Sequence, residues 1–165
     1  MAKRRKNEYV NNKDFLAALI KYRDDVRAAE ADGKSRPRVP NYIGECIMKI
    51  ATHLARKPNF INYTFKDDMI SDGIENCLQY IDNFNPDKSN NPFAYFTQII
   101  WYAFLRRIAK EKKQMYIRFK SSHNMVAQGA TYESNEVQLH LNTNADYINS
   151  FIEDFEEKLN KNKDK

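Results

Sequence analysis

Residues 68–113 constrain the fold of this chain most, because they combine two helical patterns with a connector bounded by Pro86 and Pro92. The first helix is expected from about Phe65 to Phe84, with apolar residues three and four apart: Ile70, Ile74, Cys77, Leu78, Ile81 and Phe84. The second is expected from Pro92 to about Gln114 or beyond, with Asn91 as its N-cap. Two amphipathic helices at this spacing favour a helical domain.

Two further helices are expected before this stretch. The first is capped by Asn12 and ends near Gly33. The second runs from about Asn41 to Arg56 with a regular apolar stripe: Ile43, Cys46, Ile47, Ile50, Ala51 and Leu54. The sequence therefore predicts an all-α fold with one compact helical domain over residues 9–120.

The remaining segments lack the pattern of a packed core. Residues 1–8 are basic without an apolar anchor, so we expect a disordered arm. Residues 121–144 are polar and weakly periodic, which is typical of a flexible linker. Residues 145–165 form a tail with a short amphipathic helix.

Composition excludes several classes of protein. A charged fraction of 30% and a mean hydropathy of −0.78 exclude a membrane-spanning segment. Cys46 and Cys77 lie on apolar helix faces and are expected to be buried free thiols of an intracellular protein. The three histidines lie far apart, so we expect no metal site and no cofactor.

One side of the helix after Pro92 carries the line Tyr95, Ile99, Tyr102 and Arg106, which continues to Lys110 and Lys113. Aromatic residues at helical spacing usually pack in a core. Here seven basic residues and one acidic residue follow between positions 103 and 120. Aromatic rings beside clustered cations suit stacked bases and phosphates, so the pattern favours DNA contact.

The helix before it has a polar side rich in carboxylates, which includes Asp67, Asp68, Asp72 and Glu75. Carboxylates in a first turn suit the helix dipole, and most acidic faces are solvated surfaces. The residues alone leave a docking function open.

Three motifs give the chain a resemblance to a known family: Asp-Met-Ile-Ser-Asp-Gly at 68–73, Asp-Asn-Phe at 82–84 and Pro-Phe-Ala-Tyr-Phe-Thr-Gln-Ile-Ile at 92–100. They resemble region 2 of the bacterial primary sigma factors. Residues 9–13 through 91–95 are also similar to the small late-promoter sigma factors of T-even-type phages. The resemblance implies a non-enzymatic factor that directs host bacterial core RNA polymerase, in the host cytoplasm at the nucleoid, to late viral promoters.

The resemblance also implies roles for particular residues. The polymerase contact would involve Asp68, Met69, Ser71, Asp72, Glu75 and Gln79. Opening of a −10-type promoter element would involve an everted base stacked on Tyr95. The chain departs from the family at its tryptophan pair, which is Gln98-Ile99 here. The expected DNA-binding set is Tyr95, Gln98, Ile99, Tyr102, Arg106, Arg107, Lys110 and Lys113.

The tail segment Ser-Phe-Ile-Glu-Asp-Phe at 150–155 looks similar to the motif by which late sigma factors bind the phage sliding clamp, so the resemblance implies the clamp, and a coactivator, as further partners. Clamp contact would use Phe151, Ile152 and Phe155. The alternative is that these side chains pack back onto the protein, and the sequence does not decide between the two.

Two other functions remain open. One is a coactivator or inhibitor that binds polymerase without reading DNA. The other is a small nuclease with Asp67, Asp68 and Asp72 as metal ligands, although a metal phosphodiesterase also needs ligands from other segments.

Overall fold

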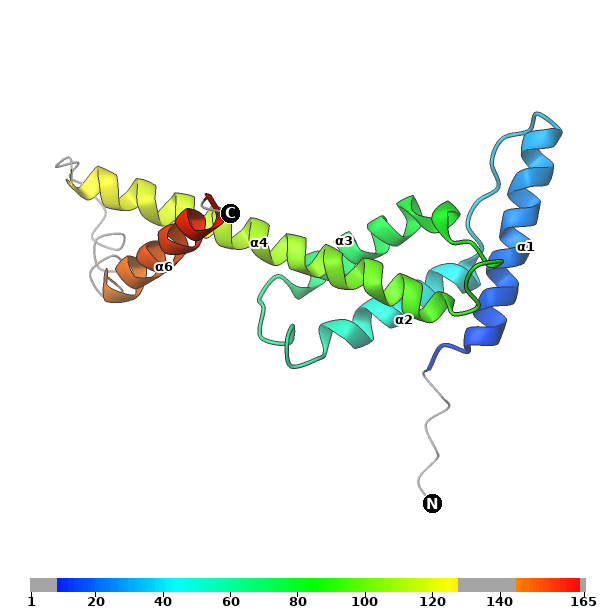
Figure 1. The fold of residues 1–165 in the computed structure, drawn as a ribbon, viewed down its shortest axis with the longest axis horizontal. Helices are drawn as coiled ribbons and strands as arrows, with labels where there is room; N and C mark the ends of the chain where they lie inside the picture. Colours follow the sequence, from blue (N-terminus) through cyan, green and yellow to red (C-terminus); the bar gives the residue numbers. More distant parts are fainter. Residues whose placement is uncertain (1–8, 128–144, 164–165) are drawn as a thin grey trace, which may run out of the picture. The chain divides into compact units, whose positions relative to one another are not determined.

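The computed structural model describes residues 9–127 and 145–163, and every regular element in these ranges is a helix, which confirms the all-α fold. The elements are α1 (Asn12–Ala31), α2 (Asn41–Ala55), α3 (Lys66–Gln79), the 3₁₀-helix η1 (Ile81–Asn83), α4 (Pro92–Ala127) and α6 (Ala145–Lys163) (Figure 1). The chain divides into two compact units, residues 1–107 and 108–165, and α4 contributes residues to both.

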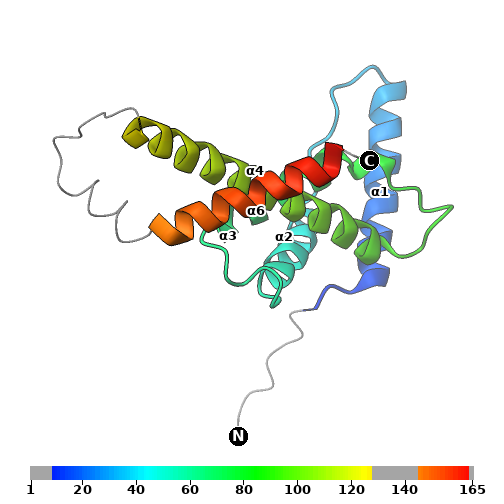
Figure 2. The same ribbon diagram turned by 60° about the vertical axis from the view of Figure 1, so that its left-hand side comes forward.

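The core of the first unit is built on the first half of α4, where Phe96, Ile100 and Phe104 are fully buried. Phe15 of α1 lies with its ring centroid 5.4 Å from that of Phe96. Phe60, between α2 and α3, packs edge-on against Phe104 at 5.1 Å. In Figures 1 and 2, α2 and α3 lie alongside this half of α4. All six residues of the predicted α2 stripe are buried, as expected.

The helix ends follow local capping chemistry. Asn91 caps α4, because its side-chain oxygen accepts a hydrogen bond from the Ala94 N–H at 3.1 Å, and Pro92 is the first helical residue. Both expectations are confirmed. The α1 helix ends where Gly33 takes a φ of +66°, with the Gly33 and Lys34 N–H groups bonded back to α1 carbonyls.

The expected cap of α1 was wrong by one residue. Asn11 caps α1 by accepting a hydrogen bond from the Lys13 N–H at 3.0 Å. The Asn12 side chain instead accepts from the Phe93 N–H at 3.1 Å and donates to the Asn90 carbonyl at 3.2 Å. Asn12 therefore supplies a second cap to α4 from a distant part of the chain, and it fixes α1 against the start of that helix.

The loop after α1 is held against η1 by one arginine. Arg36 donates two hydrogen bonds to Asp82, at 2.6 and 2.7 Å, and a third to the Tyr22 hydroxyl at 3.2 Å. These bonds raise the pKa of Arg36 above its ordinary value, with Asp82 the larger cause. The loop is thereby tied both to α1, which precedes it, and to η1, which is distant in sequence.

The third predicted helix differs from the expectation in length and in rotation. It ends at Gln79, and η1 follows it. Its buried residues are Met69, Gly73 and Cys77, whereas Leu78 is 41% exposed. The predicted stripe had placed Leu78 inside, so that part of the prediction was wrong.

Gly73 explains this rotation. A Cβ atom at position 73 would lie 3.0 Å from Ile100 Cγ2 and 3.2 Å from Phe104 Cε1. The absence of a side chain lets α3 approach α4 closely, and the buried face centres on this contact. Burial raises the pKa of Cys77, one turn further along, to about 12. Cys46 and Cys77 are both buried free thiols, as predicted.

The second unit pairs the C-terminal half of α4 with α6. The Tyr116 and Phe155 rings stack with centroids 4.6 Å apart, and Phe119 meets Phe151 edge-on at 5.5 Å. The Glu156 carboxylate accepts hydrogen bonds from the Tyr116 hydroxyl at 2.8 Å and from Lys120 Nζ at 2.7 Å. Aromatic stacking and one shared carboxylate thus join the two helices.

The predicted boundaries need two corrections. The helix α4 continues through Ala127, so residues 121–127 are not a linker. Extending a formed helix is far easier than starting one, and the first glycine that follows is Gly129. The first compact unit also ends at residue 107 rather than 120. The predicted basic arm (1–8) and the rest of the predicted linker (128–144) lie outside the described residues.

Substitution of Gly73 by valine should lower the free energy of unfolding by about 1–3 kcal/mol, because the new side chain overpacks the contact with Ile100 and Phe104. Gly44 provides a matched helical control, since a Cβ there meets nothing within 4 Å. Gly44→Val should change stability by no more than about 0.5 kcal/mol. Chemical denaturation of both variants tests this, and equal effects at the two positions would contradict the close contact.

The attachment of α6 should weaken in acid. Hydrogen bonds from Lys120 and Tyr116 lower the pKa of Glu156, so its stabilising effect is present above the ordinary carboxylate pKa and is lost as the pH falls through the lowered value. Amide exchange of α6, followed from about pH 6 to pH 3, should show this loss. Glu156→Gln should flatten the pH dependence, and Glu153→Gln, at an exposed position, should not. Identical profiles for all three proteins would refute the role of Glu156.

Candidate functional site

The solvent-facing side of α3 keeps most of the residues that were predicted to contact polymerase. We define the acidic face as the exposed polar side chains of this helix: Asp67, Asp68, Ser71, Glu75 and Gln79. Gln79 Nε2 donates a hydrogen bond to Glu75 Oε1 at 3.3 Å, which orders the C-terminal end of the face. The face therefore offers carboxylate and amide groups over the length of α3.

Met69 is the exception, because its side chain is fully buried. It lies one turn before Gly73 on the side of α3 that faces the core. Its predicted position on a docking surface is corrected, since a fully buried side chain cannot touch a partner while the unit stays folded. Met69 supports the acidic face only through the packing of α3.

Arg107 joins α4 to two carboxylates of α3. Its guanidinium lies 3.0 Å from Asp68 and 3.2 Å from Asp72, and its side chain is only 17% exposed. The sequence had placed Arg107 among the DNA-binding residues. In this structure, opposite charges on the neighbouring helix hold this side chain largely away from solvent, and its contact with DNA stays a prediction. We call these three residues the carboxylate lock.

The exposed side of α4 in the first unit carries the other predicted DNA contacts. We define the aromatic face as Tyr95, Gln98, Ile99, Tyr102 and Arg106. Tyr102 is 52% exposed and Gln98 is exposed, while Ile99 is half-buried. Arg106 is exposed, but its Nη2 also donates a hydrogen bond to Asn76 of α3 at 2.6 Å. One side of the helix thus combines a free tyrosine ring, an amide and a cation.

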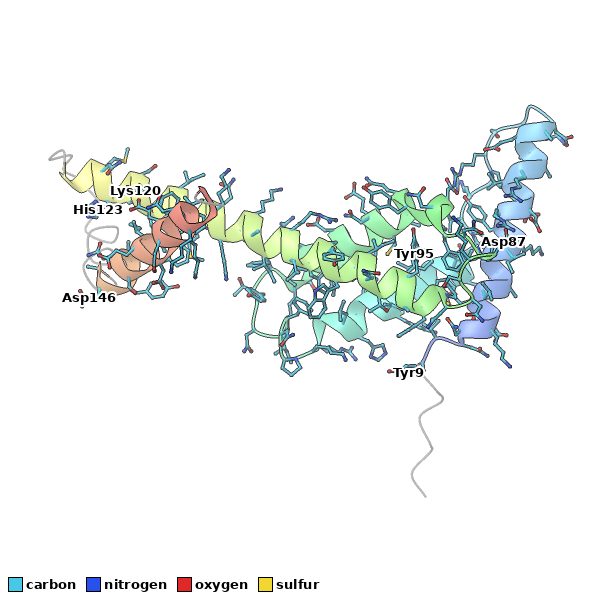
Figure 3. The ribbon with its side chains drawn as sticks, in the orientation of Figure 1. Tyr9, Asp87, Tyr95, Lys120, His123 and Asp146 are labelled. Atoms are coloured by element: carbon cyan, nitrogen blue, oxygen red, sulfur yellow. The ribbon has the colours of Figure 1, made fainter. Side chains whose placement is uncertain are left out.

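Tyr95 lies at the edge of this face, beside the C-terminal end of α3 (Figure 3). Its hydroxyl donates to the Tyr80 carbonyl at 3.3 Å, and its ring packs 5.2 Å from Phe84 and 5.1 Å from Phe96. Burial raises the pKa of Tyr95 above its ordinary value. The ring is held in a fixed orientation by the core, with its side chain half-buried.

The last two predicted DNA contacts, Lys110 and Lys113, are exposed and belong to the second unit. Phe151, Ile152 and Phe155, predicted for clamp contact, lie in that unit as well. Ile152 is 7% exposed, and the rings of Phe151 and Phe155 pack on Phe119 and Tyr116. In this structure the tail packs back onto the protein, which was the alternative left open by the sequence.

The residues proposed as nuclease ligands do not form a metal site. Within 9–127 and 145–163, no three histidine, cysteine or carboxylate side chains are arranged to hold a metal ion. Asp68 and Asp72 contact Arg107 instead. In the same part of the chain, no helix has the length and apolar character needed to cross a membrane.

Two residues that position these faces were missed by sequence reasoning. Gly73 sets the distance between α3 and α4, and Asn76 holds Arg106. A glycine inside a helical pattern was the available signal for the first, because it is unfavourable there unless close packing requires it. Nothing in the pattern indicated Asn76, since its role depends on a residue that is 30 positions away.

Comparison with known proteins adds no assignment: no protein-family model matches the chain, and no curated protein matches it.

The carboxylate lock should appear as an energetic coupling between Arg107 and Asp72. A double-mutant cycle with Arg107→Ala and Asp72→Ala should give a coupling of about 1 kcal/mol in the free energy of unfolding. A parallel cycle with Arg107→Ala and Glu75→Ala serves as the control, because Glu75 is exposed and should couple by no more than about 0.3 kcal/mol. A coupling of zero for Asp72 would show that the pair adds nothing to the packing of α3 on α4.

Proposed function

We propose that this protein is a sigma-like transcription initiation factor, which docks on host bacterial core RNA polymerase and directs it to late viral promoters. The observation that carries the proposal is that two neighbouring helices of one unit expose faces of different chemistry, the acidic face on α3 and the aromatic face on α4. The resemblance of residues 68–73 and 92–100 to sigma region 2 supports this assignment. The factor would act with the polymerase in the host cytoplasm, and catalysis would reside in the polymerase.

Polymerase docking would use the acidic face. Ser71, Glu75 and Gln79 lie four residues apart, so their side chains follow one side of α3. Asp68 keeps a 58% exposed side chain despite its contact with Arg107, so it can still meet a basic partner group. Such a line of polar and charged groups suits a partner helix with complementary cations. Complementary charges orient the two proteins and speed their association more than they raise the affinity.

Recognition of a −10-type element would use the aromatic face. Tyr95 and Tyr102 are seven positions apart on α4, which corresponds to roughly 10 Å at ~1.5 Å per residue. Gln98 lies between them and offers both a donor and an acceptor to a base edge. Arg106 adds a cation for phosphate, while the tyrosine rings offer surfaces for unpaired bases.

The absence of the tryptophan pair affects how the promoter strands would be separated. Gln98 and Ile99 cannot stack on a base pair as indole rings do, so the exposed ring of Tyr102 becomes the main aromatic surface for a displaced base. Stacking of a base on an aromatic side chain is worth about 1–3 kcal/mol. This amount can stabilise an opened strand whose separation is assisted by the polymerase or by supercoiling.

One observation favours a second candidate, a polymerase-binding coactivator or inhibitor that does not read DNA. Two of the cations predicted for DNA are engaged by α3, since Arg106 bonds to Asn76 and Arg107 pairs with Asp68 and Asp72. If these contacts persist in the complex, Arg107 stays paired with carboxylates and Arg106 keeps one N–H group on Asn76, so the first unit has fewer guanidinium N–H groups left for phosphate. Clamp contact through α6 stays a prediction, and it would require Phe151 and Phe155 to leave their partners on α4.

Run-off transcription with bacterial core polymerase, on a supercoiled template with an A/T-rich −10-type element, tests the proposal. Glu75→Lys should weaken polymerase binding by about tenfold, equivalent to ~1.4 kcal/mol. Tyr102→Ala should leave polymerase binding within about twofold but lower initiation by about tenfold, because only base stacking is lost.

Glu45→Lys provides the matched charge reversal, since Glu45 is an exposed residue of α2 and belongs to neither face. It should retain binding and initiation. Normal initiation by Tyr102→Ala with impaired binding by Glu75→Lys would favour the coactivator. Absence of polymerase binding by the unmodified protein would eliminate both candidates.

A further inference from the structure

The second unit contains a groove of about 500 Å³ between the C-terminal half of α4 and α6. Its lining residues come from both helices: Ala109, Lys112 and Lys113 from α4, and Phe151, Asp154, Phe155, Lys158 and Leu159 from α6. A volume of this size lies within the range of protein sites that hold ligands or anchoring side chains. None of the functions considered so far uses it as a receiving site.

The groove exists because α4 does not cover the apolar stripe of α6 along its whole length. Ile148 and Ile152 are 9% and 7% exposed, whereas Leu159, further along the same helix, is 44% exposed. Ala109 lines this part of α4, and its methyl group is too small to fill the space beside Leu159. An apolar floor of Phe151, Phe155 and Leu159 therefore remains open to solvent over roughly two helical turns, ~12 Å.

The rim of the groove is positively charged. Lys112, Lys113 and Lys158 are exposed, and within the part of the chain that the structure describes they make no salt bridge. Lys120 and Lys161 of the same unit, in contrast, pair with Glu156 and Glu157. Asp154 is the one carboxylate among the lining residues. Three lysines around an apolar floor are complementary to a ligand that combines apolar groups with negative charge.

We propose that this groove is a docking site for an acidic amphipathic peptide segment of a partner protein. Apolar side chains of the segment would enter over Phe155 and Leu159, while its carboxylates would pair with Lys112 and Lys158. This is the groove form of helix recognition, in which one apolar face is buried and the charged flanks set the orientation. The site differs from the clamp prediction, because here the partner supplies the inserted side chains and α6 stays in place.

The groove suits a peptide better than a nucleic acid. The Phe155 ring is stacked on Tyr116, and the Phe151 ring packs against Phe119, so part of each ring is already covered and less ring surface is left for a stacked base. Half of the lining side chains are apolar and cannot pair with phosphate. Asp154 would repel a phosphate backbone, whereas a peptide can place an apolar residue beside it.

Fluorescence anisotropy with the full-length protein tests the proposal. The probe is a fluorescein-labelled peptide of about four helical turns, with leucine on one face and glutamate on the other. The unmodified protein should bind it, and added salt should weaken the binding. The combined variant Lys112→Glu with Lys158→Glu should lose at least about tenfold in affinity.

Two further variants keep the test specific. Arg118→Glu, at an exposed α4 position that does not line the groove, should change the affinity by less than about twofold. Ala109→Trp keeps every lysine but fills the groove, so it should also abolish binding. Circular dichroism confirms that each variant is folded.

Three outcomes would overturn the proposal. The first is no binding of the acidic peptide by the unmodified protein. The second is an equal loss of affinity in Arg118→Glu, which would indicate attraction to net charge alone. The third is binding of a single-stranded oligonucleotide, but not of the peptide, with the same dependence on Lys112 and Lys158. The test does not involve polymerase or promoter DNA, so its result is independent of the initiation function.

Discussion

The close approach of α3 to α4 at Gly73 is the contact on which the first unit depends. Because position 73 lacks a side chain, Ile100 and Phe104 pack directly against the α3 backbone, and Met69 and Cys77 are buried on either side. The same contact fixes which residues of α3 face outward. A rotation of this helix would bury carboxylates, and an unpaired buried charge costs far more than the apolar area could return. The acidic face is therefore a consequence of where the glycine lies.

The carboxylate lock links this packing to the proposed function. Arg107 joins α4 to Asp68 and Asp72, and Arg106 joins it to Asn76, so two cations of α4 are held by the helix that carries the acidic face. A partner that attracts Asp68 or Asp72 would weaken the hold on Arg107 and leave that cation available for phosphate. In this arrangement, polymerase docking and DNA affinity would be coupled through shared charges rather than through a change of fold.

The sequence predicted the structure correctly where a helix buries a single apolar face in the core. The α2 stripe was correct at all six positions, and Asn91-Pro92 marked the start of α4, because these signals are local. The sequence-based prediction failed where the burial of a side chain depends on a residue that is distant in the chain. Leu78 was assigned to the core and Met69 to the surface, since a glycine adds nothing to an apolar pattern yet sets the rotation of α3. The ion pairs of Arg107 were not foreseen either, because its two carboxylate partners belong to another helix.

Site-specific photo-cross-linking tests most directly whether the acidic face contacts polymerase and the aromatic face contacts DNA. It would be done in a complex of core polymerase, promoter DNA and the full chain. Benzoylphenylalanine would replace Glu75 in one protein, Tyr102 in a second and, as a control, exposed Met48 of α2 in a third. We expect cross-links from position 75 to polymerase, from position 102 to the promoter near its −10-type element, and no strong product from position 48. Cross-links from both 75 and 102 to polymerase alone, with none to DNA, would contradict this expectation.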